Sequence, residues 1–126
     1  MIHVNEEQQL AYIAGFFDGE GCISIENGAR GMILRCITCQ KFDDRPLELM
    51  EDVFGGGCHT HKSSGVRKHV VIGRKAVAML ERLMPLLLVK RRQAEIAVMM
   101  FEMSKEERLE AVEQLQVLKK SKFLGV

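Results

Sequence analysis

The order of predicted elements constrains the fold more than any other feature of the sequence. Helical spacing of apolar residues predicts five helices, over 6–18, 44–54, 74–84, 90–103 and from Ser104, in a capping-box pattern with Glu107, through Leu118. Alternating residues and intervening turns predict two strand pairs, 22–27 with 32–41 and 58–62 with 67–73. This αββαββα order, followed by C-terminal helices, predicts an α+β fold. One face of a four-stranded antiparallel sheet would be backed by helices and the other left open.

The length of 126 residues is near the commonest size of one domain, so we expect a single domain over 1–126. No apolar run is long enough to predict a membrane span, and the first residues show no basic and apolar targeting pattern. We therefore expect a soluble intracellular protein of the cytoplasm or an organelle matrix. The four cysteines are then expected to be reduced thiols.

Charge is unevenly distributed although the net charge is only +1. No acidic residue lies between Glu26 and Asp43, or between Asp52 and Glu81, and these acid-poor segments contain most of the predicted strands. We expect the polar face of the second strand pair to carry Thr60, Lys62, Arg67, His69 and Val71. An open sheet face that is basic suits contact with nucleic acid, since phosphate neutralisation supplies most non-specific affinity.

The stretch LAYIAGFFDGEG, residues 10–21, ends an apolar helix with more charge and glycine than a helix cap needs. Gly15 and Gly19 are four residues apart, so they share a helix face with Ala11 and allow another backbone to approach closely. The alternative is that these glycines pack tightly against the protein's own core. Glu20 follows at the helix C-terminus, where the dipole disfavours a negative charge and a divalent cation would compensate.

The same twelve residues resemble the signature of the LAGLIDADG homing endonucleases, whose αββαββα order spans nearly the whole chain in the same way. Two further blocks, CQK at 39–41 and LVKRRQA at 88–94, fall where that family keeps functional residues. The chain departs from some members by carrying Glu in place of Asp at position 20. Little sequence follows its last helix, so a C-terminal DNA-clamping segment is expected to be missing or reduced.

The resemblance implies a catalytic site made of Glu20, Gln40 and Lys90. Glu20 and Gly19 would bind Mg²⁺ or Mn²⁺, Gln40 would position the attacking water, and Lys90, with Lys41 nearby, would stabilise charge on the phosphate. It also implies a homodimer, because one motif provides half of a site. The expected interface residues are Ala11, Gly15, Asp18 and Gly19, with Asp18 serving as a cap or an interface residue.

The function implied is a site-specific, metal-dependent DNA endonuclease that makes a double-strand break at a long pseudo-palindromic site. The residues expected to face DNA are Ser24, Glu26, Asn27, Arg30, Arg35, Ile37, Lys41, Thr60, Lys62, Arg67 and His69. The alternative is a non-cleaving binder on the same scaffold, either an intron maturase that binds RNA or a transcription regulator.

A zinc-stabilised interaction module is a third hypothesis, because CITC at 36–39 and CHTH at 58–61 supply four ligands. Strand geometry argues against it. Cys36 and Cys39 would point to opposite faces of a strand, and the residues between them offer no turn. The last helix ends in lysines, including Lys119, Lys120 and Lys122, which we interpret as complementing the helix dipole rather than binding phosphate.

Overall fold

The computed structural model of the chain describes residues 5–28, 31–100 and 105–120, with Asn27, Gly28 and Lys105 described by their backbone only. The elements follow in the order α1 (Glu6–Glu20), β1 (Gly21–Gly28), β2 (Gly31–Gln40), α2 (Arg45–Phe54), β3 (Gly57–Thr60), β4 (Arg67–Ile72), α3 (Arg74–Leu83), the short 3₁₀ helix η1 (Met84–Leu86), α4 (Arg91–Met99) and α5 (Lys105–Lys120). The predicted α+β fold is confirmed. None of the helices described is long and apolar enough to cross a membrane.

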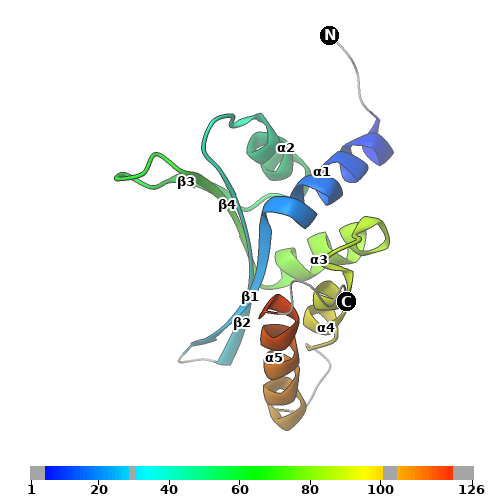
Figure 1. Ribbon diagram of the computed structural model, residues 1–126. Helices are drawn as coiled ribbons and strands as arrows, with labels where there is room; N and C mark the ends of the chain where they lie inside the picture. The colour runs from blue at the N-terminus through cyan, green and yellow to red at the C-terminus, as the bar shows by residue number, and fades with distance from the viewer. Residues whose placement is uncertain (1–4, 29–30, 101–104, 121–126) are drawn as a thin grey trace.

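The four strands form one antiparallel sheet in the order β1-β2-β4-β3. Figure 1 shows the helices on one side of this sheet and the other side open, with the sheet curving around the open side. Hydrophobic side chains of α1, α2, α3 and α4 pack with one face of the sheet into a single main core. The open face therefore lies opposite the core, as the sequence predicts.

Helix α1 begins with a capping box and ends two residues later than predicted. Asn5 Oδ1 accepts a hydrogen bond from Gln8 N at 2.8 Å, and Gln8 Oε1 accepts one from Asn5 N at 3.1 Å. Ile13, Ala14 and Phe17, which share one face of α1, are buried. The helix ends at Glu20, and Gly21 begins β1 directly, so no loop separates the motif helix from the sheet.

Burial alternates along β1 and β2 as predicted. Ile23, Leu34, Cys36 and Thr38 are buried on the core face, while Ser24 and Arg35 are partly exposed on the open face. The prediction for the second hairpin is wrong by one residue. His69 and Val71 are buried on the core face of β4, so Lys68, Val70 and Ile72 occupy the open face instead.

The ends of other helices also differ from the predictions. Asp44 stands at the N-cap position of α2 but makes no capping hydrogen bond, because its carboxylate is paired with Arg67 at 2.7 Å. Helix α4 ends at Met99, and the remainder of the predicted 90–103 helix falls partly outside the described residues. The predicted cap at Ser104 also lies outside them. The glycines after α2 end that helix as predicted, with Gly55 at a φ of 76°.

Candidate active site and nucleic-acid interface

The junction of α1 and β1 presents an exposed carboxylate. Glu20 is the last residue of α1, and within the described residues it makes no hydrogen bond or ion pair. The last carbonyl groups of a helix have no partner in the helix, which leaves the carbonyl of the exposed Gly19 available next to Glu20. Both predicted metal ligands are therefore accessible at one helix end.

Asp18 holds this junction against the beginning of α4. Its carboxylate accepts backbone hydrogen bonds from Leu88 at 2.6 Å, Val89 at 3.1 Å and Lys90 at 2.9 Å. These N–H groups precede α4, where a negative charge also complements the helix dipole. The cap predicted for Asp18 is thus an intramolecular one that joins residues 70 or more positions apart.

Lys90 lies at the same junction. Its Nζ donates a hydrogen bond of 2.6 Å to the carbonyl oxygen of Asp18. Partial burial lowers the pKa of Lys90, and the charges of Asp18, Cys22 and Glu20 act in the opposite direction. A partly desolvated ammonium group is thereby held near the exposed carboxylate of Glu20.

Gln40 and Lys41 end the neighbouring strand. Gln40 is the last residue of β2 and is half-buried; its Oε1 accepts hydrogen bonds from the backbone N of Lys41 at 2.9 Å and of Phe42 at 3.5 Å. Lys41 is exposed beyond the strand, with its Nζ 5.7 Å from the centre of the Phe42 ring. Within the described residues, the amide N–H₂ group of Gln40 makes no hydrogen bond, so it can donate to a ligand.

The outward face of α1 is made of small residues that nothing else in the described structure covers. Ala11, Gly15 and Gly19 are exposed, and a Cβ placed on either glycine would have no described atom within 4 Å. Glycine costs about 1 kcal/mol relative to alanine inside a helix. Because both glycines are exposed, tight packing against the protein's own core, which was the alternative interpretation, does not explain why they are there.

The open sheet face carries four of the residues predicted to face DNA: Ser24, Glu26, Arg35 and Ile37. Arg35 Nη1 forms an ion pair of 2.9 Å with Glu26. The sequence reasoning missed His59 and Lys68, which are opposite each other in β3 and β4 and share this face. Lys62 is exposed in the turn between those strands.

Three residues of the second hairpin that were predicted to face DNA, Thr60, Arg67 and His69, lie on the other face of the sheet. His69 is fully buried, and its Nε2 is hydrogen-bonded to the carbonyl oxygen of Gly55 at 2.8 Å. Arg67 belongs to the same face and is paired with Asp44, and Thr60 is opposite Arg67. None of the three shares the open face with Arg35. Arg30 lies outside the described residues, and the side chain of Asn27 is not described.

Lys119 is a basic residue at this site that sequence reasoning set aside. Its Nζ donates a hydrogen bond of 3.1 Å to the carbonyl oxygen of Ile23, and its charge contributes to lowering the pKa of Lys90. It comes from the last turn of α5, 96 positions along the chain, so no local pattern could have revealed the contact.

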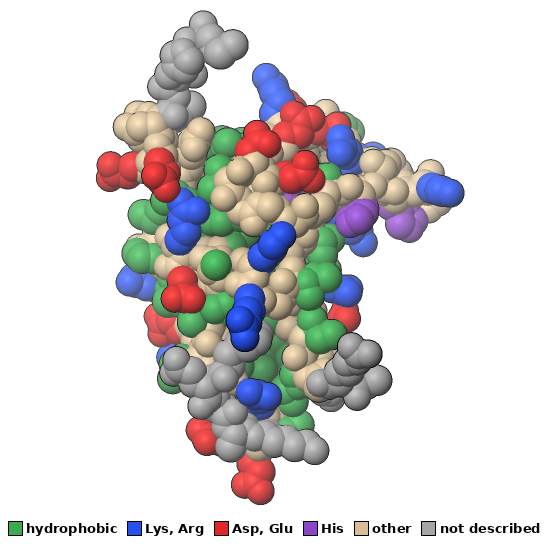
Figure 2. All heavy atoms as spheres, turned by 180° about the vertical axis from the view of Figure 1, so that it is seen from behind, with side chains coloured by type: hydrophobic (Ala, Val, Ile, Leu, Met, Phe, Trp, Pro, Cys, Tyr) green, Lys and Arg blue, Asp and Glu red, His purple; other side chains and the backbone are tan. Residues whose placement is uncertain are grey.

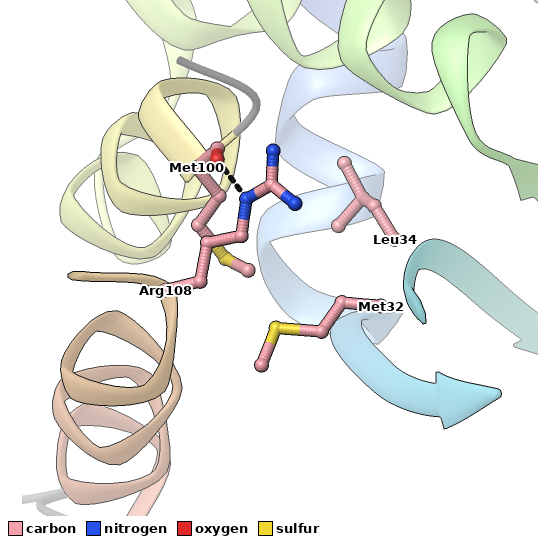
Figure 3. Close-up of a pocket in the computed structure, with 4 residues that line it drawn as sticks. All are labelled: Met32, Leu34, Met100 and Arg108. Atoms are coloured by element: carbon pink, nitrogen blue, oxygen red, sulfur yellow. Dashed lines mark hydrogen bonds between the residues drawn. The ribbon is translucent and has the colours of Figure 1, made fainter. Parts of the chain in front are cut away.

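A cavity of about 40 Å³ between β2, α4 and α5 contains none of the predicted site residues. It is lined by Met32, Leu34, Met100 and Arg108, and Arg108 Nε donates a hydrogen bond to the Met100 carbonyl oxygen at 2.9 Å (Figure 3). An arginine bonded to a carbonyl at the end of a helix is a common C-terminal cap. The cavity is a packing feature between these elements.

The zinc hypothesis lacks the geometry it needs. Cys36 is buried on the core face, and burial raises its pKa to about 12, whereas Cys39 is on the other face of β2. Among the described residues, no group of three or more His, Cys, Asp or Glu side chains could hold a metal ion.

Comparison with known proteins gives matches among solved structures only: no protein-family model and no curated protein matches the sequence. The homing endonuclease I-CvuI, solved in complex with DNA in the presence of Mg, superposes with a TM-score of 0.78 at 21% identity, over 93% of this chain and 85% of its own. The archaeal intron-encoded homing endonuclease I-Vdi141I, complexed with DNA, gives a TM-score of 0.72 at 19% identity, over 94% and 89%.

A larger enzyme with the same fold matches over only part of its length. The LAGLIDADG homing endonuclease I-GzeII, in complex with its DNA target, gives a TM-score of 0.63 at 18% identity and covers 98% of this chain but 46% of its own. The present chain thus corresponds to slightly less than half of that protein. The resemblance seen in the sequence is confirmed at the level of the fold.

Proposed function

We propose that this chain, which has the fold of the LAGLIDADG homing endonucleases, is a metal-dependent, site-specific DNA endonuclease that acts as a homodimer. The observation that carries the proposal is the exposed carboxylate of Glu20 at the end of α1, two residues after the Asp18 carbonyl group that accepts a hydrogen bond from the ammonium group of Lys90. The DNA complexes of I-CvuI and I-Vdi141I support double-stranded DNA as the partner.

The donor set at the helix end fits a hard divalent cation such as Mg²⁺. Mg²⁺ prefers oxygen ligands and is usually held by one or two carboxylates together with water and substrate phosphate oxygens. One chain offers the Glu20 carboxylate and the Gly19 carbonyl, and a second copy would offer the same pair. When bound, the cation supplies stabilisation of the charge that develops on the attacking and leaving oxygens.

The other residues of the site prepare and hold the substrate. Lys90, with Lys41 exposed at the end of β2, would neutralise a phosphate whose bond is to be broken. The free amide group of Gln40 would orient a water molecule toward that phosphorus. Asp18 is a positioning residue: it fixes Lys90 through both the backbone N–H and the side-chain Nζ.

The homodimer would form through the exposed face of α1. Ala11, Gly15 and Gly19 allow the same helix of a second copy to approach closely, and this symmetric pairing would bring two Glu20 side chains together. Each half would then act on one DNA strand. A two-fold symmetric protein reads a site with matching two-fold symmetry, which leads us to expect a pseudo-palindromic target.

The test is a cleavage selection with the full chain. A plasmid library carrying a long randomised duplex segment is incubated with the protein and Mg²⁺, and linear and nicked products are sequenced, with a chelator-treated sample as control. We expect metal-dependent cleavage at one family of related, roughly symmetric sites. If specific duplexes are bound but never cut, the nuclease assignment is wrong and the non-cleaving binder replaces it. If no duplex is bound, the proposal as a whole fails.

A further inference from the structure

The open face of the sheet exposes a strip of four apolar, β-branched side chains. We define this apolar strip as Ile33, Ile37, Val70 and Ile72. Ile72 is 48% exposed and Ile33 39% exposed, and neither hydrophobic core cluster includes any of the four. Figure 2, which views the molecule from behind, shows hydrophobic side chains on the flank below the projecting hairpin, with Lys or Arg side chains beside them. Apolar side chains left uncovered in a row on an open sheet face form a candidate binding surface.

The strand register makes the strip continuous. Ile37 is directly opposite Val70, and Ile72 is directly opposite Arg35, in the β2–β4 pair. Ile33 comes two residues before Arg35 and lies on the same face of β2. The high β-propensity of these residues explains why they suit strands, but threonine would serve a strand equally well without exposing apolar area.

Charged and polar side chains border the strip. Arg35 stands between Ile33 and Ile37 on β2 and is paired with Glu26 on β1, while Lys68 and His59 share the face on the β4 and β3 side. An apolar strip that has the cations of Arg35 and Lys68 beside it, the first of them paired with Glu26, suits the major groove of DNA, where phosphates flank the base edges. The groove is wide enough to admit two strands of a sheet.

Only one group in the major groove offers apolar contact, namely the C5-methyl group of thymine. RNA lacks this methyl group, and its major groove is too narrow for side chains to read. We infer that the apolar strip recognises thymine methyl groups, and that the strip gives the protein both part of its sequence preference and a preference for DNA over RNA. This inference rests on the proposed function and names the bases that its binding face selects.

The strand geometry also sets the spacing of the recognised bases. Successive residues on one face of an antiparallel strand are about 6.8 Å apart, which is twice the rise of 3.4 Å per residue. The rise of B-DNA is also about 3.4 Å per base pair, so neighbouring levels of the strip correspond to steps of about two base pairs. The Ile37–Val70 level is closest to Glu20, because β1 begins at Gly21 opposite Thr38. Ile72 with Arg35 forms the next level, and Ile33 the outermost.

The experiment replaces thymine by uracil, which removes the methyl group and keeps every Watson–Crick hydrogen bond. A duplex is first selected by binding to the wild-type protein from a randomised library, in Ca²⁺ so that recovery does not depend on cleavage. Each thymine of the selected duplex is then replaced singly by deoxyuridine, and the dissociation constant is measured by fluorescence anisotropy. We expect a three- to five-fold weaker complex at positions about two base pairs apart in each half-site, as the loss of one buried methyl group predicts.

Two variants link each position to a side chain. Val70→Thr and Ile72→Thr keep branched side chains that suit a strand but remove apolar contact, so each should abolish the uracil penalty at its own level only. Val117→Thr is the matched control, because Val117 is an exposed valine of α5 that is not part of the apolar strip, and the penalty should persist at every level.

The outcomes separate this inference from the proposed function. If the protein binds a specific duplex and uracil substitution has no effect at any position, or the selected site has no thymine at these levels, the inference is overturned while DNA binding stands. If no duplex is selected, the proposed function itself fails. If Val70→Thr and Ile72→Thr instead disperse a self-associated form without changing uracil sensitivity, the strip is a protein interface and the inference is wrong.

Discussion

Replacing Gly15 by alanine should change stability in opposite directions in the monomer and in the dimer. Gly15 is in the middle of α1, its backbone has no positive φ, and a Cβ there meets no described atom within 4 Å. In the isolated chain, Gly15→Ala should therefore raise the free energy of unfolding by about 1 kcal/mol, the ordinary helix propensity difference. For a domain of this size, that gain corresponds to a rise of roughly 4 °C in the melting temperature.

In the proposed dimer the same methyl group faces its own copy across the α1 interface. Overpacking a tight contact typically costs about 1 to 3 kcal/mol, which would raise the dimer dissociation constant about 5- to 150-fold. Gly15→Leu adds a far larger group and should leave a folded monomer at all accessible concentrations. The sign of the stability effect of Gly15→Ala should consequently depend on protein concentration.

The assay combines sedimentation velocity over a concentration series with urea unfolding below and above the dissociation constant. Gly21→Ala is the control, because its Cβ would overlap the buried ring of Phe17 and should destabilise the chain at every concentration. A wild-type protein that sediments as a monomer at micromolar concentration, or a Gly15→Leu variant that remains a dimer, would refute the assignment of α1 as the interface.

Three further predictions follow from individual contacts. Asp18→Asn should lower the free energy of unfolding by about 1 to 3 kcal/mol, because the single amide oxygen of Asn cannot accept the three backbone hydrogen bonds that the carboxylate accepts. A thermal melt identical to that of wild type would show that these three hydrogen bonds do not stabilise the junction. Burial lowers the pKa of His69 below that of the unfolded chain, so its contribution to stability is fully present above about pH 6.5 and is lost as the pH falls toward the folded-state pKa. His69→Gln should flatten that slope in unfolding experiments from pH 7.5 to 5, and a slope equal to that of wild type would count against it. Lys68→Ala, if Lys68 contacts phosphate, should reduce the slope of log K against log salt by about one per subunit in anisotropy titrations, whereas an unaltered slope would remove Lys68 from the DNA contact.

The sequence predicts the element order, the core face of α1 and the two faces of the first hairpin because each has one clear period. Strand β4 has no such pattern: His69 and Val71 alternate with Val70 and Ile72, so both faces read as partly apolar. Tertiary contact decides between them. The buried ring of His69 has a hydrogen-bond partner on the core face, since the carbonyl group of Gly55, 14 positions away, accepts a hydrogen bond from it.

In the candidate site, too, local motifs were predictable from the sequence, whereas contacts between distant segments were not. The motif and the two short blocks point to Glu20, Gln40 and Lys90, and the fold places the side chain of Lys90 at the end of the motif helix that carries Glu20. The hydrogen bonds from the backbone before α4 to Asp18, and the hydrogen bond from Lys119 to Ile23, join segments that are far apart in the sequence. The periodicity of a local segment cannot predict contacts between segments that are distant in the sequence. The pairing of Asp44 with Arg67 likewise replaces a cap that the local sequence predicts.

The most direct test of the account is cleavage by Glu20→Gln. The substitution keeps the size of the exposed side chain and removes the charge that a hard divalent cation requires. With the site recovered by selection and saturating Mg²⁺, we expect wild-type affinity for the duplex, a monomer–dimer equilibrium like that of wild type, and loss of strand cleavage in single-turnover assays. Cleavage at the wild-type rate would contradict the assignment of Glu20 as the metal-binding carboxylate and with it the proposed active site.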